Sequence, residues 1–117
     1  MNLVRLARGQ HPRPPQAELR QRSVFDSGTR HIGEVANLYV DDDDRTLHFV
    51  DVVTSGFMGL GKKHHLVPVE AITDESPGSI TLGVDEATVE RAPTLSNPKA
   101  GPDDQLQRAV REHYGYG

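Results

Sequence analysis

The stretch FDSGTRHIGEVANLYVD, residues 25–41, decides how the rest of the chain can fold. It opens with turn residues, because the Asp26 carboxylate can accept bonds from nearby backbone amides and Gly28 tolerates a positive φ. A strand is expected to follow over residues 31–40. The acidic run at residues 41–44 then predicts a hairpin turn that leads back into a second strand.

The expected strand is interrupted by Gly33. A glycine inside a strand marks a bulge or a close approach of two backbones, as the corners of barrels require. Val35 and Leu38 lie three residues apart, which breaks the period of two that a strand face needs. A bulge near residues 36–37 would bring both side chains to the same face.

The second strand is predicted over residues 46–53, TLHFVDVV. Leu47 and Phe49 point to one face, and Val50 and Val52 point to the other. Apolar residues on both faces of a strand indicate that both faces are covered. The cover is either the C-terminal segment or a second subunit, and the sequence leaves both open.

Turns and short strands continue after a Gly-rich run, SGFMGLGKK, at residues 55–63. Further strands are predicted at residues 65–67, 80–82 and 88–90, with a turn at residues 76–78. About six short strands separated by frequent turns indicate an all-β fold of the small-barrel kind.

The two ends of the chain differ from its centre. Residues 1–18 are predicted to form a flexible, basic, Pro-rich arm, and residues 19–92 the barrel. Residues 93–117 are predicted to form a linker and a short helix over residues 103–114. An isolated helix of about a dozen residues is marginal in water, so this one needs a docking surface. Its apolar stripe has a spacing of four and consists of Leu106, Val110 and Tyr114.

Composition narrows the classes of function. The chain has 117 residues, 35% of them hydrophobic, and no cysteine, which excludes a disulfide framework, a thiolate zinc site and a cysteine nucleophile. No apolar run approaches the roughly 20 residues of a membrane span, and we expect a cytoplasmic protein. Residues 1–22 hold five Arg and one Glu, whereas the remainder is strongly acidic. An acidic body disfavours a nucleic-acid surface on the barrel itself.

The two stretches together resemble the PRC-barrel domain. That family combines a turn glycine, an Ile-Gly-x-Val strand ending near an Asp, a Gly-rich segment and a Val-Pro-Val-x-x-Ile run. The matching residues here are Gly28, Ile32, Gly33, Val35, Asp41, Gly56, Gly59, Gly61, Val67, Pro68, Val69 and Ile72. The resemblance implies a barrel of SH3-like size without catalytic activity. The family includes the H subunit of the photosynthetic reaction centre and a bacterial ribosome maturation factor. This sequence lacks the transmembrane helix of the first and has no room for the N-terminal domain of the second, so neither function carries over.

Motifs that would carry chemistry fail on inspection. The run Gly56–Lys63 nearly matches a phosphate-binding loop, but Lys63 stands where a hydroxyl must bind magnesium, and a strand follows. The run of aspartates lacks the Gly and Glu of a calcium loop. A zinc site needs three or four converging ligands. His64 and His65 are adjacent and would face opposite ways in a strand, whereas His31 and His48 could be cross-strand neighbours. We expect no metal, no cofactor and no enzymatic activity.

The function expected from the sequence is a non-catalytic protein-interaction module that self-associates, with a dimer favoured, and has an unknown protein partner. The Gly-rich run contributes Phe57, Met58 and Leu60, which either tuck into the barrel or form an exposed contact patch. The C-terminal stripe is the other candidate contact. The alternative is an RNA- or ribosome-associated accessory protein whose basic arm contacts phosphate. Its arginines would be Arg5, Arg8, Arg13, Arg20 and Arg22.

Overall fold

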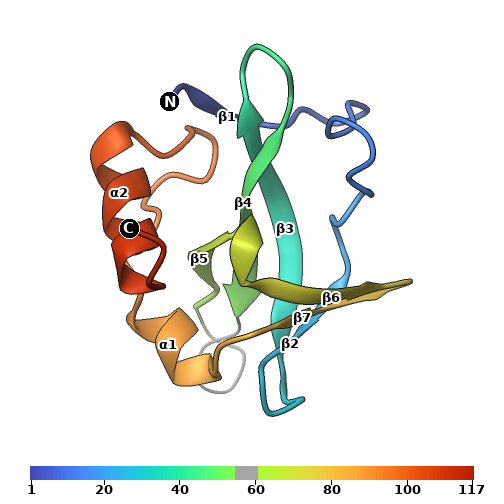
Figure 1. Cartoon of the computed structure of the whole chain (residues 1–117), viewed down its shortest axis with the longest axis vertical. Coiled ribbons are helices and arrows are strands. Elements are labelled where there is room, and N and C mark those ends of the chain that lie inside the picture. The colour runs from blue at the N-terminus through green and yellow to red at the C-terminus, as the bar shows by residue number, and fades with distance from the viewer. Residues whose placement is uncertain (55–60) are drawn as a thin grey trace.

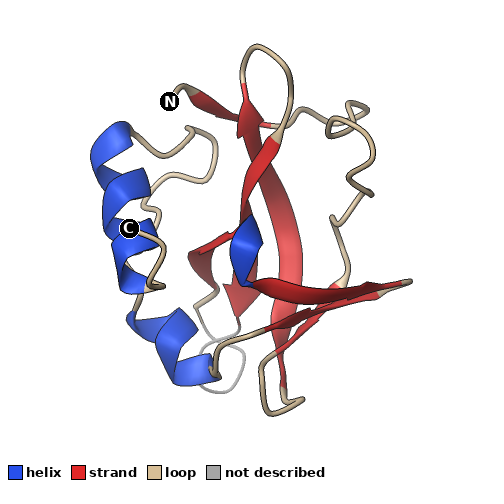
Figure 2. Ribbon diagram, viewed as in Figure 1, coloured by secondary structure: helices blue, strands red, loops and turns tan. Residues whose placement is uncertain are grey.

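The computed structural model of the chain describes residues 1–54 and 61–117. Its strands form one curled sheet in the order β5-β4-β3-β2-β7-β6, with β1 paired to β3 (Figure 1). Helices α1 and α2 lie on one side of the sheet, and a short 3₁₀ helix, Val69–Ala71, leads into β6 (Figure 2). The elements are β1 (Leu3–Arg5), β2 (Ser23–Phe25), β3 (His31–Asp41), β4 (Leu47–Thr54), β5 (Lys63–Pro68), β6 (Ile72–Ser76), β7 (Ser79–Leu82), α1 (Glu86–Arg91) and α2 (Asp104–His113). The all-β, barrel-like prediction is confirmed.

The β3–β4 hairpin is the centre of the sheet. Its register shifts between Val35 and Asn37, which is the bulge that the spacing of Val35 and Leu38 predicted. The acidic run forms the turn, where the Asp41 amide donates to the Thr46 carbonyl at 2.9 Å. The bulge leaves Val35 and Leu38 both buried, because it restores them to one face.

The sheet curls because β2 pairs with two different partners. It runs antiparallel to β3 and parallel to β7, with Val24 opposite Gly33 on one side and Ile80 on the other. β6 then returns antiparallel to β7 through the turn at residues 77–78. Val24 and Ile80 are fully buried, so the core lies inside this curl.

The C-terminal segment covers one face of the hairpin within the same chain. Residues that pair across strands share a face, so Tyr39, Phe49 and Pro68 lie on one side of the sheet. The Tyr39 hydroxyl donates to the Pro98 carbonyl at 2.7 Å, which places the segment before α2 over that side. The C-terminal segment of the same chain, and not a second subunit, therefore covers the second apolar face of β4.

Two expectations differ from the structure. The N-terminal arm is not free along its length, because β1 pairs with β3 and both Leu3 and Leu6 are buried in the core. The strand expected at residues 88–90 is instead part of α1. Asp85 caps this helix by accepting from the Thr88 amide at 2.9 Å, and this cap outweighs the strand propensity of Thr88 and Val89.

Candidate functional site

The turn before β3 is held together by Asp26. One of its carboxylate oxygens accepts from the Gly28 amide at 3.0 Å and the Arg30 amide at 2.9 Å, and the other accepts from the Glu86 amide at 3.1 Å. The Arg30 amide bond contributes most to lowering the pKa of Asp26 below its ordinary value. The positive φ expected at Gly28 occurs at Thr29 instead, with a φ of 63°. This turn therefore joins the β2–β3 connection to α1.

The other described motif residues also serve the fold. Gly33 lies where β4 passes closest, since a Cβ on it would come within 2.2 Å of the Val53 carbonyl oxygen. Gly61 has a φ of 73°, which favours glycine. Ile32, Val35 and Pro68 are buried, Ile72 is half-buried at the start of β6, and the Asp41 side chain accepts from the Asp43 amide in the hairpin turn. Gly56 and Gly59 lie outside the described residues.

The candidate interaction residues fall into two groups. Phe57, Met58 and Leu60 lie outside the described residues. The C-terminal stripe is packed against the chain's own core: Val110 is fully buried, Tyr114 is 8% exposed, and Leu106 is half-buried. Burial raises the pKa of Tyr114 above its ordinary value. The stripe is thus the contact surface through which α2 docks in cis.

A buried polar cluster lies on the side of the sheet that carries Tyr39. Asp51 is fully buried, and one of its carboxylate oxygens accepts from the Asn37 side-chain amide at 2.9 Å and lies 2.7 Å from Nδ1 of His64. Its other oxygen has no hydrogen-bond partner among the described residues. A carboxylate beside an imidazole can orient a general base, but no hydroxyl in the described part of the chain bonds to the His64 ring. The cluster gives one oxygen of a fully buried carboxylate two polar partners.

Sequence reasoning missed this cluster, although one signal pointed to it. Asp51 is the one charged residue inside a strand with apolar residues on both faces, and a buried carboxylate needs partners. Asp51 lies away from the aspartates of the hairpin turn, because it pairs with Asn37 on β3 and Leu66 on β5.

The adjacent histidines face opposite ways, as predicted. His64 is half-buried beside Asp51, whereas His65 is buried, with Nε2 3.1 Å from the Thr54 hydroxyl. Burial is the main cause that lowers the pKa of His65. His31 and His48 are not neighbours, since His31 pairs with Phe25 at the other end of β3. Over residues 1–54 and 61–117, no group of three or more His, Asp or Glu side chains is arranged to hold a metal ion.

The basic arm is bound to the rest of the molecule at several points. Arg13 forms an ion pair with Asp44 at 3.1 Å, and a guanidinium nitrogen of Arg22 donates to the Ser76 carbonyl at 2.9 Å. Arg20 pairs with Glu18 at 2.6 Å and donates to backbone carbonyls of the preceding loop. The hydrogen bond from Arg20 is the main cause that lowers the pKa of Glu18 to about 2. These arginines fasten the N-terminal segment to the barrel.

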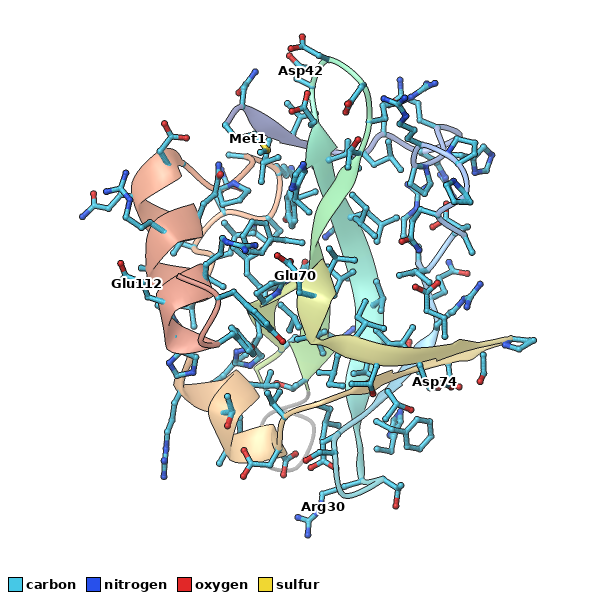
Figure 3. The ribbon with its side chains drawn as sticks, viewed as in Figure 1. Met1, Arg30, Asp42, Glu70, Asp74 and Glu112 are labelled. Atoms are coloured by element: carbon cyan, nitrogen blue, oxygen red, sulfur yellow. The ribbon has the colours of Figure 1, made fainter. Side chains whose placement is uncertain are left out.

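The described surface has few apolar features. Met1 and Tyr116 are the large hydrophobic side chains that are exposed in the described ranges, at 57% and 38%. No helix among these residues has the length and hydrophobicity needed to cross a membrane. The labelled side chains of Arg30, Asp42 and Glu112, which lie at the periphery of the molecule, are charged (Figure 3).

Comparison with known protein families identifies the family of the chain. The family model of the PRC-barrel domain matches residues 15–89, well over half of the chain. The match spans β2 to β7 and most of α1, and leaves β1 and α2 outside. No curated protein matches the chain.

Proposed function

The chain belongs to the PRC-barrel family, and from that premise we propose that it is a non-catalytic protein-interaction module. The observation that carries the proposal is that residues within the matched range have structural roles. Asp26, Gly33 and Gly61 hold turns and a close strand crossing, and Pro68 packs at the end of β5. These positions build a scaffold, and the partner is then chosen by surface residues around it.

Self-association as a dimer is the second part of the proposal. The apolar face of β4 does not support a dimer, because the C-terminal segment of the same chain covers it. The remaining candidates for a dimer contact are Phe57, Met58 and Leu60. Light scattering across a wide range of concentrations tests this part, and a monomer at every concentration would end it.

A cytoplasmic location completes the proposal, and the cysteine-free sequence is its support. The RNA-associated alternative is weaker, because Arg13, Arg20 and Arg22 already pair with groups of the same chain. An RNA surface would need those cations to face phosphate.

Affinity capture from the native cell extract tests the interaction function. The wild-type chain and a Phe57→Asp/Leu60→Asp variant serve as baits, each with and without ribonuclease. Partners that survive ribonuclease support the module, and their loss with a variant that still folds assigns contact to the Gly-rich run. Partners that ribonuclease removes would favour the RNA alternative. A matched melting temperature for the variant is the control for folding.

A further inference from the structure

β6 is the end strand of the sheet. It pairs with β7 along one edge, and no strand of residues 1–54 or 61–117 pairs with its other edge. Thr73, Asp74 and Glu75 are exposed, and the β6–β7 hairpin projects from the body of the molecule (Figure 1). Figure 3 marks Asp74 on this projecting arm. An unpaired edge of this kind is a template for an additional strand.

The register of the hairpin identifies the backbone groups on the free edge. Ser76 and Ser79 flank the two-residue turn, and such a flanking pair exchanges both of its ladder hydrogen bonds. The pairing alternates, so Glu75 opposite Ile80 is a non-hydrogen-bonded position. The N–H and C=O of Glu75 therefore point away from β7, toward the free edge.

A groove lies beside the same residue. It is lined by Glu75, Leu47, Val69 and the loop of residues 13–16, whose Gln16 side chain donates to the Glu75 carboxylate at 3.1 Å. Leu47 and Val69 give the groove an apolar wall. Glu75 and Arg13 bring opposite charges to it, and Arg13 is paired with Asp44. An extended segment added to β6 could place one side chain against this wall.

We propose that the free edge of β6 binds an extended, basic segment of a partner protein as an added strand, an inference that rests on the proposed interaction function. Asp74 and Glu75 select a segment with Lys or Arg, because opposite charges across a strand pair are favourable and like charges are not. The same acids disfavour a second copy of this chain, since two β6 strands would place carboxylates against carboxylates. The occupant is thus a different, basic protein segment.

The test uses the blocked peptide acetyl-Lys-Val-Lys-Val-Lys-Val-amide and the full chain. A second peptide has the same side chains but N-methyl groups on alternate residues, which block its edge hydrogen bonds and preserve its charge. The matched protein variants are Glu75→Pro, which removes an edge N–H at a position that makes no ladder hydrogen bond to β7, and Glu75→Ala, which keeps that N–H. Affinity is measured by fluorescence anisotropy, with circular dichroism as the folding control.

The parent peptide should bind the wild-type chain. It should bind Glu75→Pro about tenfold more weakly than Glu75→Ala, and the N-methyl peptide should bind the wild-type chain about tenfold more weakly than the parent peptide. A tenfold loss is the size expected for a missing hydrogen bond. Lack of binding to the wild-type chain would overturn the proposal. Equal binding of the parent and N-methyl peptides would also overturn it, because charge alone would then account for the affinity. If Glu75→Pro fails to fold, the two peptides on the wild-type chain still decide.

Capture with the Glu75→Pro bait separates this inference from the proposed function. Partners that bind the wild-type and Glu75→Pro baits equally would leave the interaction function standing and overturn the β6 site. Peptide binding at β6 without any captured partner would support the site and count against the wider function.

Discussion

Gly33 sets how closely β3 and β4 can approach. Its missing side chain leaves room for the Val53 carbonyl oxygen, and an added Cβ would stand 2.2 Å from it. We predict that Gly33→Ala lowers the free energy of unfolding by about 1–3 kcal/mol, the usual cost of overpacking. Urea denaturation measures it. Gly28→Ala is the control, since the nearest atom to its Cβ is 3.5 Å away, and equal stability of the two variants would contradict the prediction.

His65 makes stability depend on pH. Burial lowers its pKa, helped by the charges of Lys63 and His64 and opposed by those of Glu90 and Asp51. The unfolded chain takes up a proton near the ordinary pKa of about 6.5, before the folded chain does. Stability due to this group is therefore complete above that pH and is lost as the pH falls toward the folded pKa.

The variant His65→Gln keeps a neutral polar group and cannot titrate. The loss of unfolding free energy between pH 8 and pH 5 should be smaller in this variant than in the wild-type chain. Urea denaturation at both pH values measures the loss, and the other five histidines are the same in both proteins. Equal losses in the two proteins would show that His65 is not responsible.

Single residues were predictable from the sequence where the constraint is local. The bulge before Leu38 follows from spacing alone, and the close approach at Gly33 follows from its place in a strand. The contact of Asp51 with Asn37 and His64 was not predictable, because it depends on that bulge and on the β4–β5 register together.

At the scale of elements, α2 is held by its apolar stripe. Val110 is fully buried against the core, whereas Arg108, two residues earlier, is exposed. We predict that Val110→Ala lowers the free energy of unfolding by about 1–3 kcal/mol through the cavity it leaves, and that Arg108→Ala changes it by less than about 0.5 kcal/mol. Thermal and urea unfolding of both variants test this, and equal melting temperatures would mean that α2 is not docked.

The α2 helix was predictable from the sequence, and the α1 helix was not. The α2 helix has a capping aspartate, Asp103, and a regular stripe, and both are visible in the sequence. The α1 helix has six residues, and its Thr88 and Val89 favour strands. Its Asp85 cap and the Asp26 contact to the Glu86 amide decide the outcome, and the second of these joins residues 60 positions apart.

For the whole molecule, the barrel class follows from the count of short strands, but their order does not. The parallel pairing of β2 with β7 joins segments more than fifty residues apart, and β1 adds to β3 from beyond a Pro-rich loop. Local patterns carry no information about either pairing. The sequence therefore predicts a free N-terminal segment, although Leu3 and Leu6 supply part of the core.

The arginines of the N-terminal segment either stabilise the fold or bind nucleic acid, and Arg20 and Arg8 distinguish the two roles. Arg20 donates to the Leu6 and Ala7 carbonyls, whereas Arg8 is exposed. Arg20→Ala should lower the free energy of unfolding by about 1–2 kcal/mol, because it leaves carbonyls and the Glu18 carboxylate without their donor. Hydrogen exchange over residues 7–17 should accelerate in this variant and stay unchanged in Arg8→Ala.

An arm that binds RNA would behave in the opposite way. Removing the exposed charge of Arg8 would then weaken RNA binding and reduce its salt dependence, while stability stayed the same. Filter binding at low salt with the wild-type chain and both variants measures this. We expect no retention of RNA by any of the three, since the chain has a net charge of −4 and its inner arginines are already paired. Retention that Arg8→Ala abolishes would reverse the assignment of the arm.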